Sequence, residues 1–337
     1  SLILFTMNIS SNLSIGSIEE VFLESNQSYQ RRIQIFYPYS DKTDNETIFI
    51  IMNDGEELFN ENDSWNGKAW NIDKYFLDSA EEITNKNIVV IAIDSAKRVN
   101  GKIIDETRRY AEYFPNESIQ HFDKGLRKNL YKSLIDKAEL NHPDFITKKL
   151  LPFLEDKFNT KLGKHNLGIM GASMGGLSAI NTVIEHPDLF GFVGCISTHW
   201  IGIRPSEYLL LPFSFALDER KIIGDKVTTD GVVKYIEMNS EKLKDIKIYF
   251  DHGTESLDAF YPDAQKSVNN ILDTQGIEYK YIIFDGYGHE PEYFGKRFGS
   301  ILSYLINSLV QWEPEGDDDP LGMLVGHGVD LGDSVES

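Results

Sequence analysis

The stretch "GIMGASMGGLSAI", residues 168–180, places four glycines around Ser173, after an apolar run and before a segment with helical spacing. Glycine costs conformational entropy wherever the backbone is ordered, so this cluster indicates a turn too tight for side chains. Residues 171–175 fit G-x-S-x-G, a pattern in which a strained strand-to-helix turn exposes a serine hydroxyl above the sheet. The stretch therefore predicts a nucleophile elbow with Ser173 as the nucleophile.

Short β-rich runs alternate with helical patterns along the chain. Residues 19–25 and 31–38 predict an antiparallel pair of strands. Six later runs are apolar throughout, which is typical of strands covered on both faces; they are residues 47–55, 87–95, 166–171, 192–197, 246–254 and 281–289. The alternation predicts one α/β domain of about residues 14–312, a mostly parallel, doubly wound sheet with helices on both faces.

The segments between and after these strands carry further predictions. Helical spacing is found in residues 144–158, 177–186, 264–276 and 298–312. Two long connections, 96–143 and 200–245, exceed ordinary loop lengths, and insertions of that size are usually functional. We expect them near the active site. Residues 313–337 are acidic and glycine-rich without an apolar period, so we expect this tail to be disordered or outside the fold.

Composition limits the partners and the compartment. The net charge of −20 repels phosphate backbones, which argues against nucleic acid as a partner. Cys195 is the single cysteine, so no intrachain disulfide is possible, in keeping with a reducing compartment. No stretch approaches the roughly 20 apolar residues that span a membrane, and the first residues lack the features of a signal peptide. We expect a cytoplasmic protein, with its oligomeric state left open.

A serine hydroxyl is a weak nucleophile unless a base removes its proton. In a fold with a G-x-S-x-G elbow the order along the chain is serine, acid, histidine. His289 ends the last strand, in "FDGYGHEPEYF", and an unperturbed imidazole pKa of about 6.5 suits a proton shuttle. Asp258 is the favoured acid because it precedes the next helix, with Glu255 as the alternative; Asp251 lies within the strand, too early to reach the loop.

An oxyanion formed on the substrate needs two preorganised backbone N–H groups. One is expected from Met174, which follows the nucleophile. The other is expected from Glu56, in the "NDGEELF" loop, where Gly55 lets the backbone turn inward. In this hypothesis the identity of the Glu56 side chain is secondary. The alternative is that the loop is an ordinary turn.

At this level of detail the chain resembles a known family. "NDGEELF", "RRYAEYF", "GASMGGL", "STHW", "FDHGTESLDAFY" and "GYGH" look like motifs of the esterase-D type of esterases, over roughly residues 17–310. That group within the α/β-hydrolases includes feruloyl esterases, S-formylglutathione hydrolases and enterochelin-type esterases. The resemblance implies that Ser173 and His289 are catalytic. The family acid usually stands three residues after the glycine of the "GT" turn, where this chain has Ser256; counting back from Gly276 at the end of the next helix instead indicates Asp258.

Several residues are candidates for contact with a substrate. His199 and Trp200, in "STHW", end a strand and are expected to border the pocket. Arg108 and Arg109 could bind an anionic group through paired hydrogen bonds. An ordinary surface ion pair is an equally good interpretation of the two arginines.

These observations predict a serine hydrolase that cleaves a small-molecule carboxylic ester or thioester through an acyl-enzyme. The sequence contains no H-E-x-x-H, no cysteine ligand pair and no P-loop, so we expect neither a metal nor another cofactor. Two alternatives remain open: an acyltransferase with the same triad, and a binding protein that keeps the fold without turnover.

Overall fold

The computed structural model describes residues 7–9, 13–25, 29–39, 41–79, 87–99, 102–103, 106–122, 125–136, 141–208 and 223–310. The predicted tail at 313–337 lies outside these residues. So does the segment 209–222, which belongs to the second long connection.

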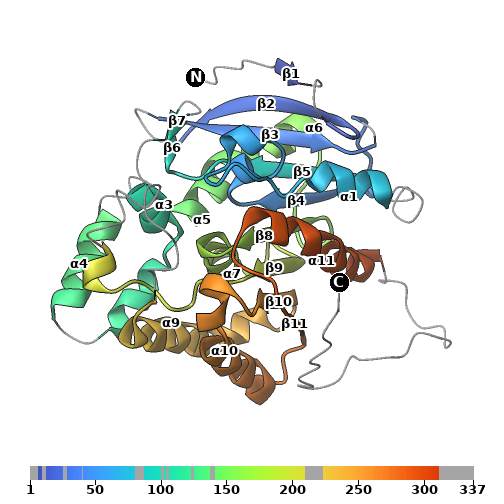
Figure 1. Ribbon diagram of the computed structural model, residues 1–337. Coiled ribbons are helices and arrows are strands. Elements are labelled where there is room, and N and C mark those ends of the chain that lie inside the picture. The colour runs from blue at the N-terminus through green and yellow to red at the C-terminus, as the bar shows by residue number, and fades with distance from the viewer. Residues whose placement is uncertain are drawn as a thin grey trace.

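A nine-stranded sheet forms the centre of the fold, in the order β1-β2-β3-β5-β4-β8-β9-β10-β11 (Figure 1). Its strands are β1 (Met7–Ile9), β2 (Ser17–Glu24), β3 (Gln30–Tyr37), β4 (Ile48–Met52), β5 (Ile88–Ile93), β8 (Leu167–Ala172), β9 (Phe192–Ile196), β10 (Lys247–Gly253) and β11 (Tyr279–Phe284). The pairing is antiparallel from β1 to β5 and parallel from β5 to β11. Both the antiparallel opening pair and the six parallel strands are as predicted. A separate ribbon joins β6 (Arg98–Val99) and β7 (Lys102–Ile103).

Helices cover both faces of the sheet. They are α1 (Ile72–Asp78), α3 (Glu106–Tyr113), α4 (Leu126–Asp136), α5 (His142–Phe145), α6 (Leu151–Phe158), α7 (Met174–Glu185), α8 (Pro205–Tyr208), α9 (Lys226–Asn239), α10 (Pro262–Gln275) and α11 (Pro291–Val310). In Figure 1, α1 and α11 lie on the near face of the sheet. The first long connection contributes α3 and α4, and the second contributes α8 and α9.

Two hydrophobic cores follow from the alternation of side chains along the strands. On β4, Ile50 and Met52 pack in the core that includes α1 and α11. Their neighbours Phe49 and Ile51 pack in the larger core, with α7, α9 and α10. A strand buried on both faces needs apolar residues at every position, and β4 is buried throughout.

The helix predicted over residues 144–158 is continuous but not uniform. A π-helical turn, Ile146–Leu150, joins α5 to α6, and Pro152 stands in the first turn of α6. Proline has no N–H to donate, and its ring clashes with the carbonyl group four residues earlier. The wider π turn accommodates the ring, so the helix continues past Pro152.

The parallel strands bring their carboxyl ends to one edge of the sheet. In open α/β sheets this edge is where ligands bind. The residues that follow β4, β5, β8, β9, β10 and β11 there include most of the polar groups that the sequence singles out.

Candidate active site

Ser173 stands between β8 and α7 in a strained conformation, with φ 58° and ψ −125°. The flanking glycines are required by space. A Cβ atom on Gly171 would lie 2.3 Å from the carbonyl oxygen of Gly175, and one on Gly175 would lie 2.8 Å from the carboxylate of Asp54. The turn is as tight as the glycine cluster predicts, and Ser173 is partly exposed while its neighbours on both sides are buried.

Asp258 and His289 form a short buried hydrogen bond. The Nδ1–H of His289 donates to Oδ1 of Asp258 at 2.6 Å, and both side chains are buried. Asp258 belongs to a 3-10 turn after β10, Ser256–Phe260, and His289 follows β11. Glu255, the alternative acid, is exposed at the start of that turn. The structure thus brings Asp258 to the imidazole.

The second carboxylate oxygen of Asp258 is also fully engaged. Oδ2 accepts the backbone N–H of Gly253 at 2.6 Å and the hydroxyl of Ser197 at 2.5 Å. Burial acts to raise the pKa of Asp258, but its bonds to His289 and Ser197 and the charge of Arg297 outweigh burial and lower it. The carboxylate is therefore ionised and fixed, as required to hold one imidazole tautomer.

A buried ion pair supports this acid from behind. Arg297 on α11 is completely buried; its guanidinium donates to Asp251 at 2.8 Å and to the hydroxyl of Ser197 at 2.9 Å. The hydroxyl of Tyr249 donates to the other oxygen of Asp251 at 2.9 Å. Arg297 is not among the site residues predicted from the sequence. Its signal is an arginine three residues after Phe294, on the apolar side of the last helix.

His199 and Tyr261 connect the elbow with the imidazole of His289. The backbone N–H of His199 donates to the carbonyl oxygen of Ser173 at 3.1 Å, and its Nδ1 is 3.0 Å from the hydroxyl of Tyr261. The Tyr261 and His289 rings pack with centroids 5.7 Å apart. Ser173, His199, Tyr261 and His289 therefore form one continuous set of contacts.

His199 is neutral. Its Nε2–H donates to the carbonyl oxygen of Gly202 at 2.8 Å, so Nδ1 is left to accept from Tyr261. Burial is the main cause that lowers the pKa of His199 to about 3. This imidazole is fixed next to the Ser173 turn, with both of its nitrogens engaged by protein atoms.

Two other predicted pocket residues lie elsewhere. Trp200 is completely buried in the larger core, and its indole N–H donates to Gln265 at 2.9 Å. The guanidinium of Arg108 stacks 4.3 Å from the centroid of the Tyr29 ring. Neither position supports a contact with substrate, and we leave both residues out of the proposed site.

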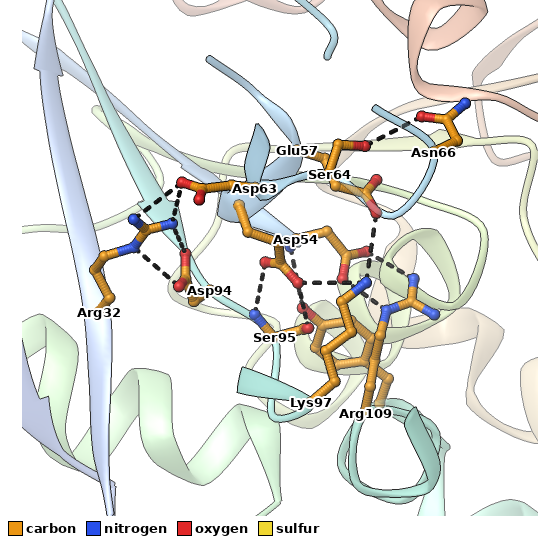
Figure 2. Close-up of polar contacts among 12 residues, drawn as sticks. Arg32, Asp54, Glu57, Asp63, Ser64, Asn66, Asp94, Ser95, Lys97 and Arg109 are labelled. Atoms are coloured by element: carbon orange, nitrogen blue, oxygen red, sulfur yellow. Dashed lines mark hydrogen bonds and ion pairs between the residues drawn. The ribbon is translucent and has the colours of Figure 1, made fainter. Parts of the chain in front are cut away.

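Arg109, the neighbour of Arg108, reaches the loop after β4 instead. Its guanidinium forms a two-point ion pair with Asp54, at 2.7 and 2.8 Å. Figure 2 shows Arg109, Lys97 and Ser95 converging on the segment that carries Asp54 and Glu57. This segment includes the 3-10 turn η1 (Gly55–Glu57), whose residue Glu56 is the predicted oxyanion donor.

Met174, the other predicted oxyanion donor, is the first residue of α7. The first N–H groups of a helix have no acceptor within it, and the positive end of the helix dipole lies at the same place. The backbone of Met174 is thus suited to bind a developing negative charge next to Ser173.

The described residues contain neither a metal-ligand cluster nor a membrane-spanning helix. Within the ranges given above, no group of three or more histidine, cysteine, aspartate or glutamate side chains is arranged to hold a metal ion. Among the same residues, no helix combines the length and the apolar character needed to cross a membrane.

Comparison with known sequences gives a family match over most of the chain. The family described as "Putative esterase" matches residues 25–305. A curated relative, the uncharacterized protein YbbA of Bacillus subtilis (strain 168), is 34% identical over 56 residues, which is 16% of this chain. The matched stretch spans 22% of that relative's length.

Solved structures share the fold at low sequence identity. A ferulic acid esterase has a TM-score of 0.55 at 15% identity, over 85% of this chain and 96% of its own. The enterobactin esterase FES from Shigella flexneri, in the presence of enterobactin, has a TM-score of 0.54 at 16% identity, over 85% of this chain and 59% of its own. An S-formylglutathione hydrolase from Agrobacterium tumefaciens has a TM-score of 0.52 at 13% identity, over 90% and 98%.

These relatives are of the three kinds that the sequence motifs suggest, and the predicted α/β-hydrolase fold is confirmed. The family match covers far more than half of the residues. The chain belongs to the Putative esterase family and has the α/β-hydrolase fold.

Proposed function

We propose that this protein hydrolyses a small-molecule carboxylic ester or thioester through an acyl-enzyme formed on Ser173. The observation that carries the proposal is the buried bond of 2.6 Å between Asp258 and His289, at the same sheet edge as the strained Ser173 turn. An ionised acid, an imidazole in a fixed tautomer and an exposed hydroxyl are the parts that a serine hydrolase requires.

In the first half of the reaction, Ser173 Oγ attacks the ester carbonyl carbon while Nε2 of His289 accepts the hydroxyl proton. Asp258 stabilises the imidazolium that forms and does not itself become protonated. Collapse of the tetrahedral intermediate expels the alcohol or thiol, which takes the proton from His289. The acyl group is then bonded to Ser173.

In the second half, water attacks the acyl-enzyme and gives its proton to His289. The tetrahedral intermediate releases the carboxylic acid, and the proton returns to Ser173. In both halves the backbone N–H groups of Met174 and Glu56 stabilise the oxyanion; one such donor is worth roughly 10²–10³ in kcat in a serine hydrolase. The mechanism needs no cofactor.

The substrate class is proposed as esters of small organic acids. The similar structures are named as a ferulic acid esterase, an enterobactin esterase and an S-formylglutathione hydrolase. The bonds that these names imply share only an acyl group bonded to oxygen or sulfur. We therefore expect an ester bond to be the common requirement.

Labelling by a fluorophosphonate probe tests the proposal directly, because the probe phosphonylates only an activated serine. The wild-type protein should be labelled with 1:1 stoichiometry and Ser173→Ala should not. Ser178→Ala is a matched control, since Ser178 lies in α7, the helix that Ser173 precedes, and is buried. Failure of the folded wild type to react would overturn the proposal. A panel of esters with short acyl, aromatic and thioester groups then identifies the substrate.

A further inference from the structure

We propose that the side chain of Glu56, clamped by Ser95 and Lys97, positions its own backbone N–H as the second oxyanion donor. This inference rests on the proposed function and goes beyond it. It assigns a role in catalysis to a carboxylate that need not touch the substrate. Glu56 is thereby a positioning residue, and the identity of its side chain matters.

The Glu56 carboxylate is held at both oxygens. Oε2 accepts the backbone N–H of Ser95 at 2.9 Å, and Oε1 accepts the hydroxyl of Ser95 at 2.5 Å. The ammonium group of Lys97 lies 3.6 Å from Oε1. All three side chains are buried, so these contacts are not weakened by exchange with water.

Ser95 is a rigid anchor for this carboxylate. It lies just after β5, the strand that pairs with β4 in parallel register, and the preceding Asp94 is fixed by Arg32 through hydrogen bonds of 2.9 and 3.2 Å. Gly55 packs directly on the same strand end, because a Cβ atom there would lie 2.7 Å from the carbonyl carbon of Ala92. The loop after β4 is therefore fixed against β5 on one side.

The opposite side of the loop is fixed to α3 and to α7, the helix that follows Ser173. Asp54 has a left-handed backbone with φ 54°, its N–H donates to the hydroxyl of Tyr113 at 3.1 Å, and its carboxylate pairs with Arg109. The amide of Asn53 donates to the carbonyl oxygen of Gly175 at 2.8 Å. These contacts set the distance from the loop to the elbow. Within the loop, the N–H of Leu58 donates to the carbonyl oxygen of Gly55 at 3.3 Å, which holds the Gly55–Glu56 peptide from one side.

The side chain of Glu56 is a further hold on that peptide, beside the backbone hydrogen bonds of the 3-10 turn. A backbone N–H is useful in an oxyanion hole only when it points at the position of the charged oxygen. The carboxylate ties Cα of Glu56 to Ser95 on the far side of the loop, so rotation of the Gly55–Glu56 peptide would break two hydrogen bonds.

Lys97 makes the clamp compatible with an anionic transition state. Burial acts to raise the pKa of Glu56, but the charge of Lys97 and the two hydrogen bonds from Ser95 outweigh burial and lower it. The Glu56 carboxylate is therefore ionised. Lys97 also lies 3.6 Å from the carboxylate of Glu57. Burial raises the pKa of Glu57, and this keeps a second negative charge from forming beside the first. The positive charge of Lys97 and the negative charge of the Glu56 carboxylate then cancel next to the oxyanion donor.

Steady-state kinetics of Glu56 variants test the inference. Glu56→Ala should lower kcat about 10- to 100-fold and change KM less than about threefold, because a misdirected donor weakens only the transition state. Glu56→Gln, which keeps one oxygen for the Ser95 N–H, should lose less than about tenfold. Ser95→Ala, which removes the hydroxyl and keeps the backbone donor, should resemble Glu56→Gln.

The affinity of an aryl boronic acid provides a second measurement, which would not change selectively if Glu56 only stabilised the fold. It forms a tetrahedral adduct on Ser173 with an oxygen in the oxyanion hole, so its affinity should fall in proportion to kcat in the Glu56 variants. The affinity of the carboxylic acid product, which lacks the tetrahedral oxygen, should stay within about threefold.

Glu155 is the matched control. Its carboxylate also accepts a backbone N–H, from Leu162 at 3.0 Å, and also pairs with a lysine, Lys161, but it lies on α6, away from the strand ends. Glu155→Ala should leave kcat and boronic acid affinity unchanged. Equal loss of boronic acid and product affinity in Glu56→Ala, or unchanged kcat in folded Glu56→Ala, would overturn the inference. A wild type that neither reacts with fluorophosphonate nor cleaves any ester would instead overturn the proposed function.

Discussion

Gly171 is the residue at which the elbow leaves least room. A Cβ atom there would lie 2.3 Å from the carbonyl oxygen of Gly175, which is backbone and cannot turn aside. We expect Gly171→Ala to lower the free energy of unfolding by about 1–3 kcal/mol through overpacking, measured by urea denaturation. Gly163→Ala is the control, because its Cβ would make an ordinary contact of 3.5 Å with His165. Equal stability of the two variants would contradict the steric account of the elbow.

Single substitutions also distinguish the two candidate acids, Asp258 and Glu255. In wild type the two carboxylate oxygens of Asp258 accept hydrogen bonds from His289, Ser197 and Gly253. Asp258→Asn replaces one oxygen with an NH2 group, which is a donor, so at least one of these three donors loses its acceptor. We expect kcat to fall roughly 10³- to 10⁴-fold with little change in KM, as for loss of the acid in a serine triad. Glu255→Asn, at the exposed start of the same turn, should change kcat less than twofold; a large loss there instead would reverse the assignment.

Residue types and chain order lead to the proposed reactive groups, Ser173 and His289, but not to the residues that support them. Ser173 and His289 follow from a motif and from the order serine, acid, histidine, which local sequence carries. Trp200 was expected to border the pocket because it ends a strand beside His199. Consecutive side chains point in different directions, however, and only the three-dimensional path of the chain decides that His199 contacts Tyr261 while Trp200 enters the core.

At the scale of elements, α11 does more than cover one face of the sheet. It carries Arg297 into the space behind Asp258, the proposed acid, where the guanidinium pairs with Asp251 and reaches Ser197. Periodicity predicts that the last segment is a helix. It does not predict which strand end the helix crosses, so an arginine on its apolar side cannot be matched with its acid from sequence.

The buried pair of Arg297 and Asp251 provides a prediction for this element. Arg297→Met leaves Asp251 buried without its cation, which typically costs about 3–5 kcal/mol in the free energy of unfolding. The double variant with Asp251→Asn removes the unpaired charge and should recover part of that loss. Chemical denaturation of the four proteins of this cycle measures the coupling. Additive losses would contradict a direct interaction between the two groups.

At the scale of the whole molecule, the site depends on a sheet order that differs from the chain order. The swap of β4 and β5 places β4 beside β8, so that Asn53 reaches the elbow at Gly175. The pairing of β4 with β5 places Ser95 beside Glu56, 39 residues earlier in the chain, and the insertion after β5 returns Arg109 to Asp54. The sequence predicts the strands and their parallel direction because each strand has its own apolar signal. It cannot predict these contacts between distant segments of the chain, since they depend on which strands become neighbours.

Buried histidines make the stability of the whole protein depend on pH. Burial is the main cause that lowers the pKa of both His142 and His199, the latter to about 3. Through these two histidines the unfolded chain binds more protons than the folded one below about pH 6.5, so their contribution to the free energy of unfolding should fall as the pH falls from 6.5 toward 3.

Removal of one buried imidazole tests this linkage. His199→Gln should be less stable than wild type at pH 7, since it gives up the bonds to Tyr261 and Gly202. Between pH 6.5 and 4.5 its stability should also decline less steeply, by up to about 1.4 kcal/mol per pH unit. Urea denaturation at several pH values, with the exposed His165→Gln as control, measures both effects. If the wild type and His199→Gln keep the same slope below pH 6.5, His199 is protonated in the folded protein, and the fixed neutral imidazole beside Ser173 must be abandoned.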